Sequence, residues 1–215
     1  MNNKKNNFIH NDPYTIGVEE EYMICDPFSG DLVNKADKIF DILPKKYKDR
    51  FSYELLLSEI EINTSVCRNV PESINEVLLL RNIVRDVGKK LDFKIGISGT
   101  HPTAICQEQV FVNNESYNWV AKQLKYYAKR NVTFSTHVHI AVHDKECAIQ
   151  VANSLRRWIA PLLALSTNSP FFEGVLTGLK SSRIFQFGVF PRTNIPIYFK
   201  NYDEYLKIVK NYISS

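Results

Sequence analysis

The sequence predicts an α+β fold. Three segments, at 14–25, 55–66 and 134–142, alternate apolar and polar residues with the period of two that half-buried strands show. Between them, apolar residues recur every three or four positions, which is typical of amphipathic helices. No glycine-rich phosphate loop follows a strand, so the pattern favours an α+β domain over a doubly wound parallel sheet.

The composition indicates a globular protein and excludes several other classes. Of the 215 residues, 44% are hydrophobic and 23% are charged, which excludes a disordered tail, a collagen and a coiled coil. The formal net charge is +4 and no long basic run is present, so we expect no nucleic-acid partner. The four cysteines show no C-x-x-C spacing, which argues against a structural zinc site. The longest apolar stretch, at 158–165, is too short for a bilayer, and we expect a cytoplasmic protein with no membrane partner.

The first half of the chain is predicted to contain two strands and two helices. After a polar arm at 1–13, a single domain at 14–215 begins with strands at 14–25 and 55–66 and helices at 36–43 and 71–91. The first strand ends at the turn signal Asp26-Pro27, and the first helix stops before Pro44. Ile and Thr residues favour a strand over a helix at 55–66, and Pro71 suits the first turn of the long helix.

The second half is predicted to add two strands, at 93–98 and 134–142, and three helices. One helix covers 117–129, and a second is capped by Asp144 and precedes another apolar segment near Pro161. In that second helix, the apolar residues that share one face are Cys147, Ala148, Val151 and Leu155. Ser, Asn and Pro residues predict a loop at 166–174, and Asp203 is expected to cap a final helix.

Three of the predicted strands each place two ligand-type side chains on one face. Residues two apart on a strand point the same way, which pairs Glu19 with Glu21, Glu59 with Glu61, and His137 with His139. Neighbouring strands would bring these four carboxylates and two imidazoles together. Carboxylates about 4 Å apart repel by about 4 kcal/mol at an effective dielectric constant of about 20, so the cluster needs cations or protons. Oxygen-rich donors with an imidazole suit Mg²⁺ or Mn²⁺.

The alternative is that each polar face simply meets solvent, as in most alternating strands. For a single pair of residues this alternative is favoured. Three pairs together shift the balance towards metal, because none of the six positions has the Lys, Thr or Ser of a typical solvent face. Glu20 fits neither interpretation, since it falls on the apolar side of its strand and needs a partner.

Two further residues are candidates for binding a cofactor or substrate. His101 lies in the loop Gly99-Thr100-His101-Pro102, where an imidazole can contact a ligand; the alternative is a structural or solvated histidine. Arg183 follows two serines, and its planar guanidinium can pair with a phosphate or a carboxylate. For Arg183 the alternative is a surface ion pair.

Six segments stand in a characteristic order along the chain. They are TIGVEEEYMICDP at 15–27, ELLLSEIEINTSVC at 54–67, GTHP at 99–102, THVHIAVHD at 136–144, APLLALSTNSPFFEG at 160–174 and TGLKSSR at 177–183. Together these segments resemble the type 2 glutamate–cysteine ligase family, whose bacterial members include carboxylate–amine ligases. Each motif alone is weak, whereas six in register are specific.

The resemblance implies a largely antiparallel, glutamine synthetase-like catalytic sheet with helices packed on one side. It also implies a ligase of glutathione biosynthesis that uses ATP and Mg²⁺, with Mn²⁺ as a substitute, to form a γ-glutamyl phosphate. An amine acceptor such as cysteine then attacks this intermediate of glutamate to give a γ-glutamyl amide. Carried over residue by residue, the resemblance implies metal binding by Glu19, Glu21, Glu61 and His139, and a catalytic and ATP-binding contact by Arg183.

The chain also departs from the family pattern. Thr136 and Ala141 stand where glycine is usual, and Glu59 stands where glutamine is common. Family chains continue into a segment with a Trp-Asp-x-Arg-Pro motif, which this sequence lacks, so we expect the C-terminal part of the sheet to be missing. Two hypotheses follow: a ligase that works with a complementing C-terminal segment or as a homo-oligomer, or an inactive remnant that binds metal or a partner protein through a sheet edge.

Overall fold

The computed structural model describes residues 12–188, 190, 193 and 195–214. Residues 1–11 of the predicted polar arm lie outside the described residues. The strands are β1 (Ile16–Cys25), β2 (Phe51–Tyr53), β3 (Glu59–Asn63), β4 (Lys94–Gly96), β5 (Thr136–Ile140), β6 (Phe171–Phe172) and β7 (Val175–Leu176). The α-helices are α1 (Ala36–Ile42), α2 (Val70–Leu91), α3 (Glu115–Leu124), α4 (Tyr126–Lys129), α5 (Lys145–Leu155), α6 (Ile159–Leu165), α7 (Arg183–Phe187) and α8 (Tyr202–Ser214).

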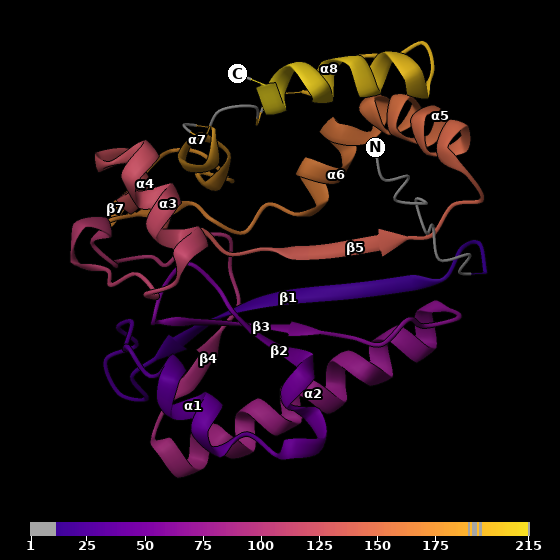
Figure 1. Cartoon of the computed structure of the whole chain (residues 1–215). Helices are drawn as coiled ribbons and strands as arrows, with labels where there is room; N and C mark the ends of the chain where they lie inside the picture. The colour runs from indigo at the N-terminus through magenta and orange to yellow at the C-terminus, as the bar shows by residue number, and fades with distance from the viewer. Residues whose placement is uncertain (1–11, 189, 191–192, 194, 215) are drawn as a thin grey trace.

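The long strand β1 is the centre of the main sheet (Figure 1). It pairs with β3 along one side, and along the other side its first half pairs with β5 and its second half with β4. Strand β2 lies beyond β3, and β6 and β7 form a separate hairpin. The described strands of the main sheet all pair antiparallel, which confirms the predicted α+β class with a largely antiparallel sheet.

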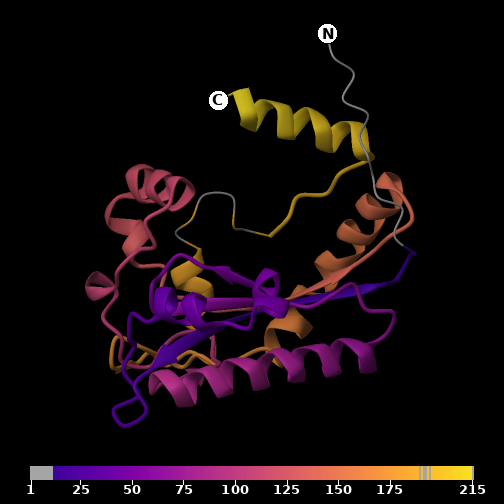
Figure 2. The same ribbon diagram turned by 60° about the horizontal axis from the view of Figure 1, so that its bottom comes forward.

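One face of the sheet is covered by α1 and α2, and Figure 2 shows α2 running along it. Tyr22 and Ile24 of β1 and Ile60 and Ile62 of β3 are fully buried there against residues of both helices. Each such side chain contributes about 2 kcal/mol by leaving water. The helix α2 begins where the Asn69 side chain accepts a hydrogen bond from the backbone of its first turn, so its start is fixed by an N-cap.

The face of β1 that points away from α2 is acidic in the first part of the strand and apolar in the second. Glu19 and Glu21 occupy its first part, whereas Met23 and Cys25 are buried in a second core further along. The segment that ends in Phe134 completes this second core. The carboxylates therefore lie at the edge of a packed core, on a strand whose other face is held by α2.

Several predicted boundaries are wrong for local reasons. The strand predicted at 55–66 is confined to β3, because residues 55–58 form a turn that ends in the buried Ser58. The helix predicted at 117–129 is divided into α3 and α4 at Lys125, which has a φ of 49°. The predicted loop at 166–174 includes strand β6, and the short elements β2 and α7 have too few residues to show a period.

Two details of the later helices also differ from prediction. The cap of α5 is Asp144, as predicted, but the residue that this helix buries is Ile149, whereas Val151 and Leu155 are exposed. In α8 the capping side chain is Asn201, which accepts a hydrogen bond from the backbone of Glu204. Asp203, the predicted cap, lies inside the first turn of that helix.

Glu20 lies on the apolar face of β1, where it pairs with α2. Arg81 donates two hydrogen bonds to its carboxylate, at 2.8 and 2.6 Å, and the Tyr22 hydroxyl donates a third at 2.6 Å. The Glu20 side chain is only 8% exposed and that of Arg81 is 37% exposed. The pair therefore satisfies a charge that would otherwise be buried alone, and it ties β1 to α2.

We expect Arg81→Met to lower the free energy of unfolding by about 2 kcal/mol, because Glu20 would remain buried without its cation. Urea denaturation would measure this loss. The double variant Glu20→Gln/Arg81→Met should recover most of it, since no charge is left unpaired. Arg85→Met removes an exposed arginine from the same helix and should change stability by less than about 0.5 kcal/mol. Equal losses of unfolding free energy in Arg81→Met and Arg85→Met would contradict this interpretation.

Candidate metal-binding active site

Strand register gathers the acidic and imidazole side chains on one face of the sheet. In the β1–β3 pair Glu21 lies opposite Glu61, and in the β1–β5 pair Glu19 lies opposite His137. Partners in register share a face, so all four side chains point to the side away from α2. The structure thus brings together the strands on which the predicted pairs lie.

The first group of ligand atoms comes from Glu19, Glu61 and His137, which offer atoms within 4.8 Å of one another. The carboxylate of Glu19 contacts two rings, at 3.2 Å from His137 Nδ1 and 3.1 Å from His139 Nε2. Burial opposes ionisation of Glu19, but the hydrogen bonds and charges of the two imidazoles outweigh it and lower its pKa. His139 therefore contacts Glu19 but is not one of the three residues of this group.

The second group comes from Glu21, Glu54 and Glu61, again with ligand atoms within 4.8 Å of one another. Glu61 belongs to both groups, so the two candidate metal positions share one carboxylate. Glu54 was not predicted as a ligand. It lies between β2 and the turn at 55–58, one residue before the predicted strand at 55–66, and the signal in the sequence is its place as the first residue of the ELLLSEIEINTSVC segment.

Burial, together with the crowding of the carboxylates, raises several of their pKa values. Burial, followed by the charges of Glu21 and Glu61, raises the pKa of Glu54 to about 7. Burial also raises the pKa of Glu21 and of Glu61. Glu59 is 3% exposed and lies outside both groups; burial and three neighbouring carboxylates raise its pKa well above the ordinary range. These carboxylates consequently bind protons more tightly than ordinary carboxylates do.

The donor set fits a hard divalent cation. Carboxylate oxygens with one imidazole are the ligands that Mg²⁺ and Mn²⁺ accept, and no thiolate belongs to either group. A bound cation would oppose both the burial and the mutual repulsion that raise these pKa values.

Arg183 lies beside the cluster, in a cavity of about 250 Å³ that Glu21 also lines. Its Nε donates a 3.1 Å hydrogen bond to the carbonyl of Phe134, and its guanidinium lies 5.1 Å from the ring centre of Phe187. Burial lowers its pKa, and the charge of Glu21 acts in the opposite direction. A Cβ on Gly99 would lie 3.1 Å from Arg183 Cδ, so the absent side chain leaves room for this arginine.

The structure does not bring His101 into the cluster. His101 is 7% exposed, its Nε2 lies 2.8 Å from the carbonyl of Gly30, and its Nδ1 accepts hydrogen bonds from the backbone of Thr103 and Ala104. Both nitrogens are therefore engaged by loop backbone. This geometry matches the structural alternative for His101 and gives no support to its predicted contact with a cofactor or substrate.

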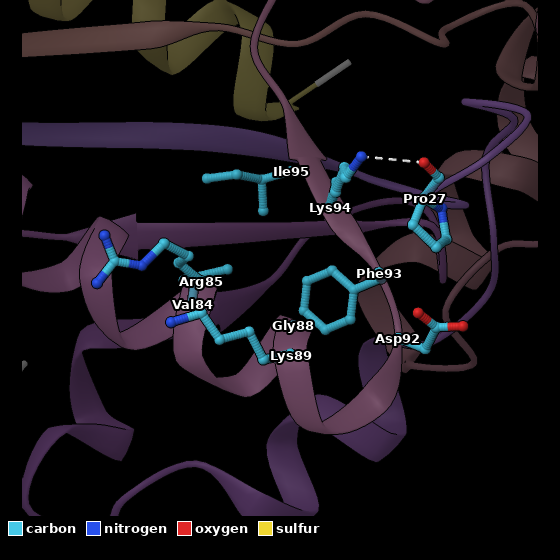
Figure 3. Close-up of a pocket in the computed structure, with 9 residues that line it drawn as sticks. All are labelled: Pro27, Val84, Arg85, Gly88, Lys89, Asp92, Phe93, Lys94 and Ile95. Atoms are coloured by element: carbon cyan, nitrogen blue, oxygen red, sulfur yellow. Dashed lines mark hydrogen bonds between the residues drawn. The ribbon is translucent and has the colours of Figure 1, made fainter.

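A larger cavity, of about 470 Å³, lies elsewhere, between the end of α2 and β4 (Figure 3). Apolar side chains including Val84 and Phe93 form it together with three cationic residues and Asp92. It shares no residue with either candidate metal group. Size alone therefore does not identify the candidate site, whereas the chemistry of the carboxylate face does.

Comparison with known proteins gives the family. The model of glutamate-cysteine ligase family 2 (GCS2) matches residues 15–214. The chain belongs to this family. A family 2 protein of Solibacter usitatus, named "Putative glutamate--cysteine ligase 2", is 38% identical over 204 residues, covering 93% of this chain and 51% of its own length. A protein of the same name from Herpetosiphon aurantiacus is 37% identical, covering 90% of this chain and 50% of its own.

The fold is shared with a larger solved structure. A bifunctional glutathione synthetase from Pasteurella multocida superimposes with a TM-score of 0.74 at 15% identity, over 94% of this chain and 30% of that one. The chain spans about half the length of the curated family 2 relatives it matches. Among the described helices, none combines the length and apolar character that crossing a membrane requires.

We expect Glu54→Gln to raise the melting temperature of the metal-free chain at pH 8 but not at pH 4. The folded pKa of Glu54 is about 7 against an ordinary 4.5, so the native state binds more protons between these values and loses stability as pH rises through that window. Gln cannot ionise and removes this loss. Thermal unfolding in EDTA would measure it, with the exposed acid Glu108→Gln as the control. A variant no more stable than the parent at pH 8 would contradict the expectation.

Proposed function

We propose that this chain provides the metal-binding part of an ATP-dependent carboxylate–amine ligase, which joins the γ-carboxylate of glutamate to an amine such as cysteine. The observation that carries the proposal is the shared carboxylate of Glu61, which belongs to two groups of candidate ligands on a rigid sheet. Family membership and the relatives' names support the reaction class.

The proposed reaction needs two charged groups to meet. The γ-carboxylate of glutamate attacks the terminal phosphorus of ATP and releases ADP, and the amine then displaces phosphate from the resulting γ-glutamyl phosphate. Bound Mg²⁺ would neutralise the phosphoryl oxygens and orient ATP against glutamate. The carboxylates of Glu19, Glu21, Glu54 and Glu61 and the ring of His137 would hold these ions.

Arg183 would position an anionic part of the substrate. Its guanidinium lies in a cavity beside Glu21, at the side of the cluster. Part burial strengthens its attraction for a carboxylate or a phosphate oxygen, because less water screens the charge. The backbone carbonyl of Phe134 fixes the Nε side of the guanidinium. We propose that the other nitrogens bind glutamate or phosphate.

We expect calorimetry of the metal-free chain to show Mn²⁺ binding that Glu61→Gln weakens at least tenfold, because one substitution removes a ligand from both groups. Glu108→Gln changes an exposed acid of the same type outside both groups and should leave binding unchanged. Mn²⁺ is chosen because its electron paramagnetic resonance spectrum gives an independent count of bound ions. Unchanged Mn²⁺ affinity in Glu61→Gln would exclude Glu61 as a metal ligand shared by the two groups.

Arg183→Met should weaken glutamate binding in the presence of Mg²⁺ about tenfold, which corresponds to about 1.4 kcal/mol, while Mn²⁺ affinity stays unchanged. The loss would arise from the missing charge–charge contact. Arg85→Met, which removes an exposed arginine on α2, is the matched control. Equal glutamate affinity in both variants would exclude Arg183 as the anion-binding residue.

A further inference from the structure

Among the five candidate metal ligands, Glu54 is the one that does not lie on a strand. The other four lie on β1, β3 and β5, whereas Glu54 lies between the end of β2 and the turn at 55–58. Strand pairing fixes the direction of a side chain, but a connecting segment does not. The place of Glu54 in the second group therefore depends on the contacts that hold the backbone on either side of it.

The residues on both sides of Glu54 are held by one later segment of the chain. The Tyr117 hydroxyl donates a 2.9 Å hydrogen bond to the carbonyl of Tyr53, and the backbone N–H of Val112 donates a 3.0 Å hydrogen bond to the carbonyl of Leu55. The first of these bonds comes from a side chain, so a single substitution can remove it without changing the backbone.

Tyr117 reaches Tyr53 from the first turn of α3. The Asn114 side chain, which is the N-cap of this helix, accepts a 2.8 Å hydrogen bond from the Tyr117 backbone. The Tyr117 side chain packs against the second core, which includes Leu55. Figures 1 and 2 show α3 on the side of the sheet opposite α2, which is the side that the carboxylates face. The helix start and the core thus fix the position of the hydroxyl.

Tyr53 is also held from the side of α1. Its ring stacks on Phe40, with 4.0 Å between the ring centres, and its hydroxyl donates a 2.9 Å hydrogen bond to Asp37. The carbonyl that Tyr117 binds therefore belongs to a residue with little freedom of movement. Glu54, the next residue along the chain, takes its direction from this anchored backbone.

Tyr117 lies close to the acidic cluster but does not donate to it. Burial, followed by the charges of four neighbouring carboxylates of which Glu54 is the first, raises the pKa of its phenol above the ordinary range. The neutral hydroxyl has one proton, and it donates this proton to the Tyr53 carbonyl. Any effect of Tyr117 on a bound metal ion must therefore pass through the backbone next to Glu54.

We propose that Tyr117 is a positioning residue for the second metal position: its hydroxyl fixes the backbone of Tyr53 and thereby directs the Glu54 carboxylate towards the ion. The inference rests on the proposed function, because it concerns one of the two ions that the ligase would use. The first group takes all three of its ligands from strands. Tyr117 consequently affects one position and leaves the other unchanged.

The test isolates each position and then removes the hydroxyl. Glu19→Gln removes a ligand of the first group alone, and Glu54→Gln removes a ligand of the second group alone. In calorimetry at pH 8, Tyr117→Phe should weaken Mn²⁺ binding about fivefold in the Glu19→Gln background, which corresponds to about 1 kcal/mol for one hydrogen bond. In the Glu54→Gln background the same substitution should leave Mn²⁺ affinity unchanged.

Phenylalanine retains the ring and its packing, and circular dichroism would verify that each variant folds. Tyr126→Phe is the matched control, because it removes a hydroxyl from a tyrosine of α4 that is 59% exposed. It should leave Mn²⁺ affinity unchanged in both backgrounds.

Three results would overturn the inference: unchanged affinity of Tyr117→Phe in the Glu19→Gln background, equal weakening in both backgrounds, or an equal effect of Tyr126→Phe. Equal weakening would show a general structural role, since such a role does not distinguish the two positions. An unsubstituted chain that binds no Mn²⁺ would reject the proposed function and this inference with it. A chain that binds two ions, neither of them sensitive to Tyr117→Phe, would reject only the role of Tyr117.

Discussion

The register between β1 and β3 is the constraint on which the candidate site depends. It places Glu21 opposite Glu61, so that like charges meet at a distance where they repel. The structure can maintain this crowding because the other face of the same two strands is buried against α1 and α2. Hydrophobic burial on one face thus offsets electrostatic repulsion on the other. A single-residue shift in register would reverse the two faces and remove both the core and the cluster.

The same central strand accounts for the incomplete appearance of the site. β1 has partners along both of its sides, but β5, which carries His137 and His139, has a free outer edge within the described residues. The acidic side of the cluster is consequently enclosed by the protein, whereas its histidine side is open. The exposed apolar residues Val138 and Ile140 and the exposed imidazoles of His137 and His139 therefore lie on the two faces of the same edge strand.

Period-two alternation predicted the three site strands and the face that their acidic residues share, because strand parity follows from covalent geometry. It did not predict Glu54, because this residue lies between β2 and the turn that precedes β3, outside the predicted strand at 55–66. The partner of Glu20 was also unpredictable, because Arg81 is 61 residues away and reaches it only once α2 packs on the sheet. For His101 the sequence left a ligand contact and a structural role open, and in the structure both of its ring nitrogens contact loop backbone.

The central claim is that the carboxylate face binds two metal ions that share Glu61. Anomalous diffraction from crystals grown with Mn²⁺ would test it most directly, because the scattering locates each ion without assuming its ligands. We expect two peaks on this face, one among Glu19, Glu61 and His137 and one among Glu21, Glu54 and Glu61. A face without a peak, or ions bound only elsewhere on the chain, would contradict the claim.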